Sequence, residues 1–453
     1  MTTHDPKAVN PEMLNLLSDL MRQAKGFGAT AADAVLADSS SVAVQRRFGK
    51  PESLTRSEEA EVGLRVFVGK RQAIVSSSDK KPETLAEMAE RAVAMARAVP
   101  EDEFAGIADP DQLATSFPDL DMYDDTELTV DQMAEMADRA EDAARAVAGI
   151  TNSEGAECNM GRETVYYAAS NGFAQGYRAS GFSLSVSVIA GQDTAMETDY
   201  EFDSVTFLAD MKDPAVIGAA AGERAVRALN PRKGKTKQVP VVFDNRVSGG
   251  IIGSLAGAIS GGAVARGTTF LKNKMGADVF AKGVTVVDDP FLKRGMRSHP
   301  FDAEGIAPTK RHIIDDGTLT GWLLDLSSAR QLGLQTTGNA ARGASAPPSP
   351  RPANFYMQAG AVPVDVLIGD IEEGFFVTQM MGSGANPVTG DYSRGARGFW
   401  IEKGRIAYPV SEMTIAGNIM DMWLRLTPAN DLTLKYGIDA PTLRIEGMTV
   451  AGS

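Results

Sequence analysis

Two kinds of hydrophobic spacing alternate along the first half of the chain. Apolar residues that recur every three to four positions predict amphipathic helices, and apolar residues that alternate with polar ones predict half-buried strands. Helices are expected at 14–24, 82–98, 133–147 and 214–229, and strands at 62–68, 73–76 and 182–188. The last strand reads Phe-Ser-Leu-Ser-Val-Ser-Val, so one of its faces is apolar and the other is lined with serine.

The second half is predicted to be rich in strands. Short apolar runs bounded by glycine and polar residues occur at 284–287, 313–314, 319–324, 364–368, 374–380, 398–402 and 405–408. The Lys403-Gly404 pair between the last two runs is typical of a tight hairpin turn. Such a series favours an antiparallel sheet or a barrel-like domain.

One uncharged segment, 247–265, carries glycine at every fourth position. The four glycines are Gly249, Gly253, Gly257 and Gly261. Because positions four apart lie on one face of a helix, they predict a single helix with a bare stripe, against which another backbone packs closely. A membrane span is disfavoured, since large aliphatic residues are few here and serines dilute them.

Length favours two domains, because 453 residues exceed the roughly 250–300 at which one core stops growing. A basic linker at 232–237 separates the two patterns. We expect a mixed α/β domain with hairpins and helices over 1–236, and a β-rich domain packed on the glycine-striped helix over 237–453. The fold class is therefore α+β.

Composition and charge disfavour several classes of function. A net charge of -14 argues against direct nucleic-acid binding, which requires clustered basic residues. The single cysteine, Cys158, excludes an internal disulfide, and the first residues lack an apolar signal core, which favours a cytoplasmic protein without membrane attachment. The three histidines, His4, His299 and His312, are too far apart in sequence to form a metal-binding pair. No catalytic residue and no metal ligand is assigned.

Five short segments together resemble the TldD/PmbA family, specifically its PmbA (TldE) branch. They are Val241-Val-Phe-Asp-Asn-Arg-Val-Ser-Gly-Gly-Ile-Ile-Gly-Ser-Leu-Ala-Gly-Ala258, Lys272-Asn-Lys-Met-Gly276, Thr336-Thr-Gly-Asn339, Gly390-Asp-Tyr-Ser-Arg-Gly395, and Gly398-Phe-Trp-Ile-Glu402 followed by Ile406-Ala-Tyr-Pro-Val-Ser-Glu412. The order of the segments carries the resemblance, which extends over nearly the whole chain.

The resemblance implies a subunit without its own metal site. In the TldD branch the equivalent helix carries a His-Glu-x-x-x-His motif, and this chain has Gly253, Ser254 and Ala258 at those positions. Zinc hydrolysis needs imidazole or thiolate ligands and a proton acceptor, which these residues do not supply. The expected partner is therefore a TldD-type catalytic subunit that holds the zinc in a heterodimer degrading unfolded or leader peptides.

Two glycine-bearing loops, 336–352 and 382–398, coincide with segments of the resemblance. Long loops on a rigid scaffold often bind ligands, so Thr337, Asn339, Ser393 and Arg394 are candidate contacts to substrate or partner. A peptide can also be held by strand addition at an exposed sheet edge.

Two other functions stay open from the sequence. In the first, the chain acts alone as a homodimeric peptide-binding or regulatory protein, similar to a DNA gyrase modulator. The isolated chain can form a homodimer both in this role and as a metalloprotease subunit. An independent hydrolase would need a nucleophile such as Ser248 or Cys158. Ser248 lies in Val-Ser-Gly-Gly rather than in a Gly-x-Ser-x-Gly elbow, and Cys158 has no histidine close in sequence.

Overall fold

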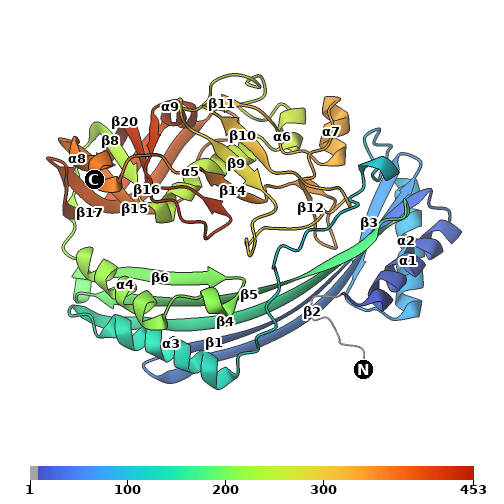
Figure 1. The fold of residues 1–453 in the computed structure, drawn as a ribbon, viewed down its shortest axis with the longest axis horizontal. Helices are drawn as coiled ribbons and strands as arrows, with labels where there is room; N and C mark the ends of the chain where they lie inside the picture. Colours follow the sequence, from blue (N-terminus) through green and yellow to red (C-terminus); the bar gives the residue numbers. More distant parts are fainter. Residues whose placement is uncertain (1–8, 453) are drawn as a thin grey trace.

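The computed structural model describes residues 9–452, and its first half is built on one antiparallel sheet of long strands. The strand order is β3-β2-β1-β4-β5-β6. The strands are β1 (Ala31–Arg47), β2 (Lys50–Val68), β3 (Arg71–Ser77), β4 (Ile150–Ala169), β5 (Ala174–Ala190) and β6 (Glu197–Val205). Four of them have 17 to 20 residues, well above the usual length of about 3–10, and the sheet curves beneath the second half (Figure 1).

Four helices cover the outer face of this sheet. They are α1 (Pro11–Gly26), α2 (Pro82–Ala98), α3 (Val130–Arg145) and α4 (Pro214–Arg227). α1 and α2 pack at one end of the sheet and α3 and α4 at the other, each pair over its own apolar cluster (Figure 1). These helices confirm the predicted ones, and Thr129 and Gln132 form a capping box at the start of α3. The alternation over 182–188 is also confirmed, since its apolar residues are buried and its serines lie on the opposite face.

A closed barrel forms the centre of the second half. Its strands are β8 (Lys237–Phe243), β15 (Glu373–Met381), β16 (Asp391–Glu402), β17 (Arg405–Asn418) and β20 (Leu443–Gly452). β20 pairs with β8 on one side and with β17 on the other, which closes the ring of five strands. The predicted hairpin turn is confirmed, because Lys403 and Gly404 both have positive φ, as a type I′ turn requires.

A second sheet and several short elements complete this half. The sheet has the order β11-β10-β9-β14-β19, and it shares one large apolar core with the barrel. Its strands are β9 (Val286–Asp289), β10 (Arg311–Asp315), β11 (Thr318–Leu319), β14 (Asn354–Met357) and β19 (Ile438–Asp439). The remaining elements are β7 (Arg232–Lys233), β12 (Ala340–Ala341), β13 (Ser349–Pro350), β18 (Leu426–Pro428), α5 (Asn245–Ala258), α6 (Gly261–Ala265), α7 (Leu326–Leu332), α8 (Val364–Gly369) and α9 (Ile419–Leu424), with single 3-10 turns at Pro110–Gln112, Asp193–Ala195 and Leu208–Asp210. The molecule thus has the predicted α+β class, with a barrel packed on the glycine-rich helix.

The glycine-striped segment is two helices rather than the expected single one. α5 ends at Ala258, and α6 begins at Gly261. Between them, the amide of Leu323 donates to the carbonyl of Ile259 (3.1 Å) and the amide of Gly261 donates to the carbonyl of Leu323 (2.8 Å). This strand-like pairing takes up backbone groups that a continuous helix would need.

Two other predictions about local structure were wrong. Residues 364–368 form the helix α8 instead of a strand, because Leu367 and Ile368 are buried while Val366 is 60 % exposed, which fits helical spacing. The predicted loop 382–398 ends early, since β16 starts at Asp391. Glycine is favoured inside β16, where a Cβ on Gly398 would lie 1.9 Å from the carbonyl oxygen of Phe376.

The two halves are joined at a buried corner of charged residues. Arg65 on β2 donates to the carboxylate of Asp33 on β1, and Arg342 reaches the same carboxylate from the second half. Burial pushes the pKa of Asp33 upward, but these two guanidinium groups hold it below its usual value. Glu304 lies 3.8 Å from Arg65. Burial raises the pKa of Glu304 to about 8 and that of its neighbour Asp302 to about 7.

None of the helices in the part of the chain that the structure describes is long and apolar enough to cross a membrane.

Candidate functional site

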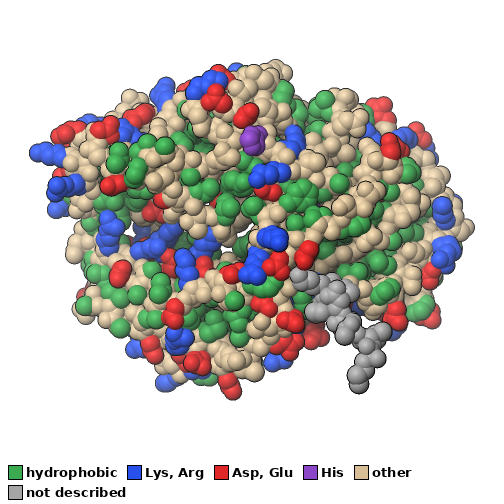
Figure 2. All heavy atoms as spheres, in the orientation of Figure 1, with side chains coloured by type: hydrophobic (Ala, Val, Ile, Leu, Met, Phe, Trp, Pro, Cys, Tyr) green, Lys and Arg blue, Asp and Glu red, His purple; other side chains and the backbone are tan. Residues whose placement is uncertain are grey.

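A hollow separates the curved sheet from the barrel on the side away from the buried corner. Figure 2 shows lysine and arginine side chains gathered around it. α5 begins here, next to the strand β6, because Asp244 caps the helix by accepting a hydrogen bond from the amide of Arg246 at 3.0 Å. The hollow is therefore bounded by both halves of the molecule.

α5 presents an open glycine face. A Cβ built on Gly249 would lie 2.6 Å from the carbonyl oxygen of Ile438, so the chain packs closely there. No atom lies within 4 Å of a Cβ built on Gly253 or Gly257. The opposite side of α5 carries buried aliphatic residues. The stripe therefore packs against neighbouring backbone at its start and leaves free space along its middle.

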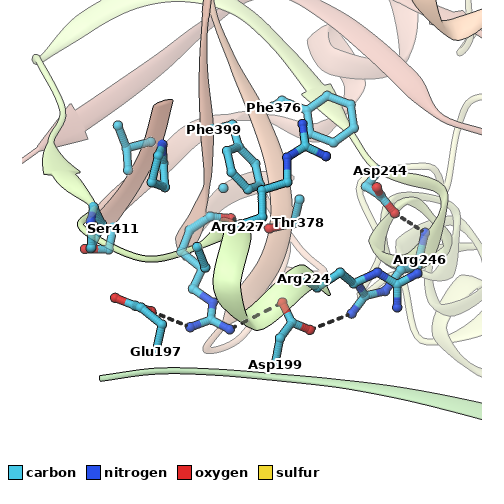
Figure 3. A pocket seen from close by; sticks show the side chains of 16 residues that line it. Glu197, Asp199, Arg224, Arg227, Asp244, Arg246, Phe376, Thr378, Phe399 and Ser411 are labelled. Atoms are coloured by element: carbon cyan, nitrogen blue, oxygen red, sulfur yellow. Dashed lines mark hydrogen bonds and ion pairs between the residues drawn. The ribbon is translucent and has the colours of Figure 1, made fainter. Parts of the chain in front are cut away.

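Four acidic residues at alternate positions of β6 pair with cations from other elements. The carboxylates are Glu197, Asp199, Glu201 and Asp203, and their partners are Arg224, Arg246, Arg397 and Lys435. We call these eight residues the β6 zipper. Arg246 belongs to α5, Arg397 to β16 and Arg224 to α4, so the zipper joins three elements to one strand (Figure 3).

The same cations cover the outer edge of β6. Arg397 donates to the carbonyl of Thr198, Arg224 to that of Tyr200 at 3.5 Å, and Lys435 to that of Phe202. These carbonyls point away from β5, the neighbouring strand. Because their lone pairs are already used, this edge cannot accept another strand unless the cations move.

A pocket opens beside the zipper, between α4 and the barrel (Figure 3). Its apolar lining comes from Phe376, Phe399, Pro409 and Val410. The guanidinium carbon of Arg227, in the last turn of α4, lies 4.5 Å from the centre of the Phe399 ring. Burial raises the pKa of Glu197, which also lines the pocket, although Arg397 opposes that rise. The pocket thus combines an aromatic floor with charged walls.

Comparison with known proteins decides the family. Residues 32–96 match the PmbA/TldA metallopeptidase domain 1, 123–229 match its central domain and 236–452 match its C-terminal domain. The chain is 37% identical over 423 residues to the Metalloprotease PmbA of Escherichia coli O157:H7, covering 93% of this chain and 92% of that protein. This chain belongs to the PmbA/TldD family.

Other members extend over its whole length. The Metalloprotease PmbA homolog of Haemophilus influenzae is 35% identical over 450 residues, which is 99% of this chain and 98% of that protein. A putative modulator of DNA gyrase from Bacteroides thetaiotaomicron superposes with a TM-score of 0.90 at 28% identity, covering 98% of this chain and all of that one. TldE from Thermococcus kodakarensis shares the fold, with a TM-score of 0.85 at 21% identity over 96% of this chain and all of that one.

The residues of α5 at the positions of the TldD-type motif do not fit the metal of a family metallopeptidase. Gly253, Ser254 and Ala258 carry no imidazole, thiolate or carboxylate, and Ala258 is buried. Over residues 9–452, no group of three or more histidine, cysteine, aspartate or glutamate side chains lies close enough together to hold a metal ion. His4 lies outside the described residues.

The two candidate residues in the loop after α7 make bonds within the protein. The hydroxyl of Thr337 accepts a hydrogen bond from the amide of Leu324 at 2.7 Å. Asn339 is 4 % exposed, and its amide group donates to the Asp288 carboxylate at 2.7 Å. Thr337 therefore fixes this loop to the segment before α7, and Asn339 fixes it to β9 of the second sheet.

Ser393 and Arg394 lie on β16 rather than in a loop, which corrects the sequence-based placement. Neighbouring residues on a strand point to opposite sides. Nη1 of Arg394 lies 3.5 Å from a Cβ built on Gly250, so Arg394 borders the glycine face of α5. Ser393 is exposed on the other side of the strand. Only Arg394 among the four candidates is placed beside the open face.

The two candidate nucleophiles are buried. Ser248 is 0% exposed, and its hydroxyl donates to the carbonyl of Ala440 at 2.9 Å. Cys158 is 1% exposed beneath α3, and burial raises the pKa of its thiol to about 12. Neither side chain is placed to attack a substrate.

Sequence reasoning missed the β6 zipper and the pocket beside it. The signal for the zipper was present, because Glu-Thr-Asp-Tyr-Glu-Phe-Asp at 197–203 alternates acidic and other residues as a strand with one acidic face would. Arg227 gave no such signal, since a basic residue in the last turn of a helix is common and interacts favourably with the helix dipole.

Proposed function

We propose that this chain is the non-catalytic subunit of a PmbA/TldD-type metalloprotease. The observation that supports the proposal is that Gly253, Ser254 and Ala258 of α5 stand where the family resemblance places the His-Glu-x-x-x-His motif, and they supply neither metal ligands nor a general base. In this proposal a TldD-type partner supplies the zinc, its ligands and the general base. The role of this chain is to complete the enclosure around a peptide.

The peptide is proposed to lie in the hollow between the two halves. The glycine face of α5 leaves room for an extended chain there, and Arg394 offers a hydrogen-bond donor beside it. The substrates are unfolded or leader peptides, because an extended chain fits such a space more readily than a folded domain does.

Side chains rather than strand addition are proposed to hold this peptide. The edge of β6 is covered by the zipper cations. The five barrel strands form a closed ring, in which each strand has a neighbouring strand on both sides over part of its length. In the described sheet, β3 pairs only with Val62–Val68 of β2, which leaves 50–61 with a free edge. That edge lies on the far side of the sheet from the second half (Figure 1).

The direct test is peptide hydrolysis by this chain, by a TldD-type subunit and by their mixture, with the zinc content of each protein measured. We expect full hydrolysis only in the mixture, and zinc only on the TldD-type subunit. Hydrolysis by this chain without bound metal would contradict the non-catalytic role.

A variant of α5 tests where the peptide lies. Gly253→Leu fills the open face, so it should lower hydrolysis by the mixture at least tenfold while this chain keeps its thermal stability. Gly26→Leu is the control, because a Cβ on Gly26 also has no neighbour within 4 Å, at the end of the distant α1. Equal activity of the two variants would contradict a peptide path along α5.

A stand-alone regulatory role is the second candidate. It is favoured by the similarity, over nearly the whole chain, to a protein described as a putative modulator of DNA gyrase. In this case the isolated chain would be a homodimer. Light scattering with and without a TldD-type subunit distinguishes the two, because a heterodimer forms only under the first proposal.

A further inference from the structure

Arg227 is the unpaired cation of the pocket beside the zipper. The pocket is lined by four arginines and three carboxylates. Arg246 and Arg397 pair with carboxylates of β6, and Arg224 pairs with Glu201. Over residues 9–452, no carboxylate lies within ion-pair distance of Arg227. The remaining lining carboxylate, Asp244, caps α5, and burial raises its pKa.

Stacking fixes the position of the Arg227 guanidinium without using its hydrogen-bond donors. Its carbon lies 4.5 Å from the centre of the Phe399 ring, within the range of a cation–π contact. A stacked guanidinium keeps its N–H groups in its own plane, where two of them can bind the two oxygens of one carboxylate. Figure 3 shows Arg227 and Phe399 together in the pocket.

The floor of the pocket suits an apolar group next to that carboxylate. Phe376 and Phe399 are each 7% exposed and Val410 is 1% exposed, so they form a rigid apolar surface. The preferred ligand therefore has a negative charge and an apolar body a few atoms apart.

We propose that this pocket binds the C-terminal residue of a peptide that ends in an aromatic or large aliphatic side chain. Arg227 takes the free carboxylate, and the side chain lies on Phe376 and Phe399. The inference rests on the proposed function in taking the ligand to be a peptide. It adds a direction to the bound chain, because the C-terminal end is held beside β6 while the rest extends toward α5.

Matched peptides test the pocket directly. Two unfolded peptides that end in phenylalanine and differ only in a free or amidated C-terminus are titrated against the full chain by fluorescence anisotropy. We expect the free carboxylate to bind at least tenfold more tightly. In Arg227→Ala the two peptides should bind equally, and Arg227→Lys should recover part of the difference because the charge remains.

Arg139→Ala is the matched control. Arg139 is also an exposed helical arginine, but it pairs with Asp213 outside the pocket. Its variant should retain the full preference for the free carboxylate. A preference that survives Arg227→Ala, or none in the unchanged protein, would overturn the proposal.

One further measurement tests which class of ligand the pocket binds, and a second tests the proposed function on which the inference rests. N-acetyl-phenylalanine carries the same carboxylate and ring, and binding as tight as that of the peptide would overturn a peptide end as the ligand. Peptide hydrolysis in the mixture with a TldD-type subunit tests the proposed function by itself. An intact carboxylate preference without activation of hydrolysis would reject that function and leave the pocket assignment standing.

Discussion

Two of the contacts between the halves bury carboxylates in different ways. In the β6 zipper, each carboxylate has a cation within ion-pair distance, and the paired side chains are 6–33% exposed. At the buried corner, Asp33 is paired twice, but Glu304 and Asp302 are held in a site where burial raises the pKa of both. Carboxylates can thus be buried by pairing or by protonation, and only the second makes a contact sensitive to pH near neutrality.

The largest expected effect comes from removing the cation of the buried corner. Arg65→Met should lower the free energy of unfolding by about 3–5 kcal/mol, because Asp33 and Glu304 lose a partner that is itself 5% exposed. Denaturant unfolding at pH 7 measures the loss. Arg71→Met is the control, since Arg71 is 41% exposed on the neighbouring strand, and it should cost less than about 0.5 kcal/mol. Equal losses of unfolding free energy in the two variants would mean that the buried corner stabilises the fold no more than an exposed ion pair does.

Protonation at the corner should appear as a pH dependence of stability. The folded-state pKa of Glu304, about 8, exceeds its usual value of 4.5, so the folded protein holds an extra proton between these pH values. The free energy of unfolding therefore falls as pH rises through this window and levels off above pH 8. Glu304→Gln should remove most of this fall and stabilise the protein at pH 8.5 by about 1–3 kcal/mol, with little effect at pH 4.5. Thermal unfolding at both pH values is the measurement, and a stabilisation that does not depend on pH would contradict the raised pKa.

The zipper should respond to the loss of one cation more weakly. Arg397→Ala leaves Glu197 with no ion-pair partner in the described chain, and we expect a loss of about 1–2 kcal/mol because these groups are partly solvated. Hydrogen exchange should also quicken in β6, whose edge Arg397 covers, while exchange in β3 stays the same. Faster exchange throughout the sheet would mean that the zipper is not a local contact.

The smallest expected effect concerns α5, which carries Arg246 into the zipper. Gly253→Ala touches nothing within 4 Å and adds helix propensity, so the free energy of unfolding should rise by about 0.5–1 kcal/mol. Gly249→Ala should lower it, because the new methyl group would lie 2.6 Å from the carbonyl oxygen of Ile438. Chemical denaturation of both variants measures the two signs, and the same sign for both would contradict the described difference along the stripe.

Regular hydrophobic patterns in the sequence were sufficient to predict the helices and strands that bury one face and expose the other. The alternation at 182–188 identified β5, and apolar residues at helical spacing over 133–147 identified α3. The long strands β1 and β4 were missed because their middles lie beyond the packed helices, so no single face is apolar there. A strand segment with no buried face has no period-two hydrophobic pattern from which it could be predicted.

The site was predictable only where residue type alone decided it. The lack of metal ligands at Gly253, Ser254 and Ala258 of α5 was visible in the sequence, and Arg394 was a candidate contact there, although it was expected in a loop rather than on β16 beside α5. Which glycines pack closely was not visible, since Gly249 and Gly253 differ only in what the distant residue Ile438 places next to them. Arg227 and Phe399 meet across 172 positions of the chain, and short-range patterns carry no information about such pairs.

Closure of the barrel sets an order of events during synthesis. β8 is the first barrel strand to emerge from the ribosome, whereas its neighbour β20 is the last strand in the described chain. β20 also pairs with β17 and thereby closes the ring. The ring therefore stays open until residue 452 has left the exit tunnel, whereas every strand of the first sheet is available once residue 205 has emerged. The apolar faces of β8 and α5 wait unpaired during that interval, which makes this half of the nascent protein the part that needs protection from aggregation.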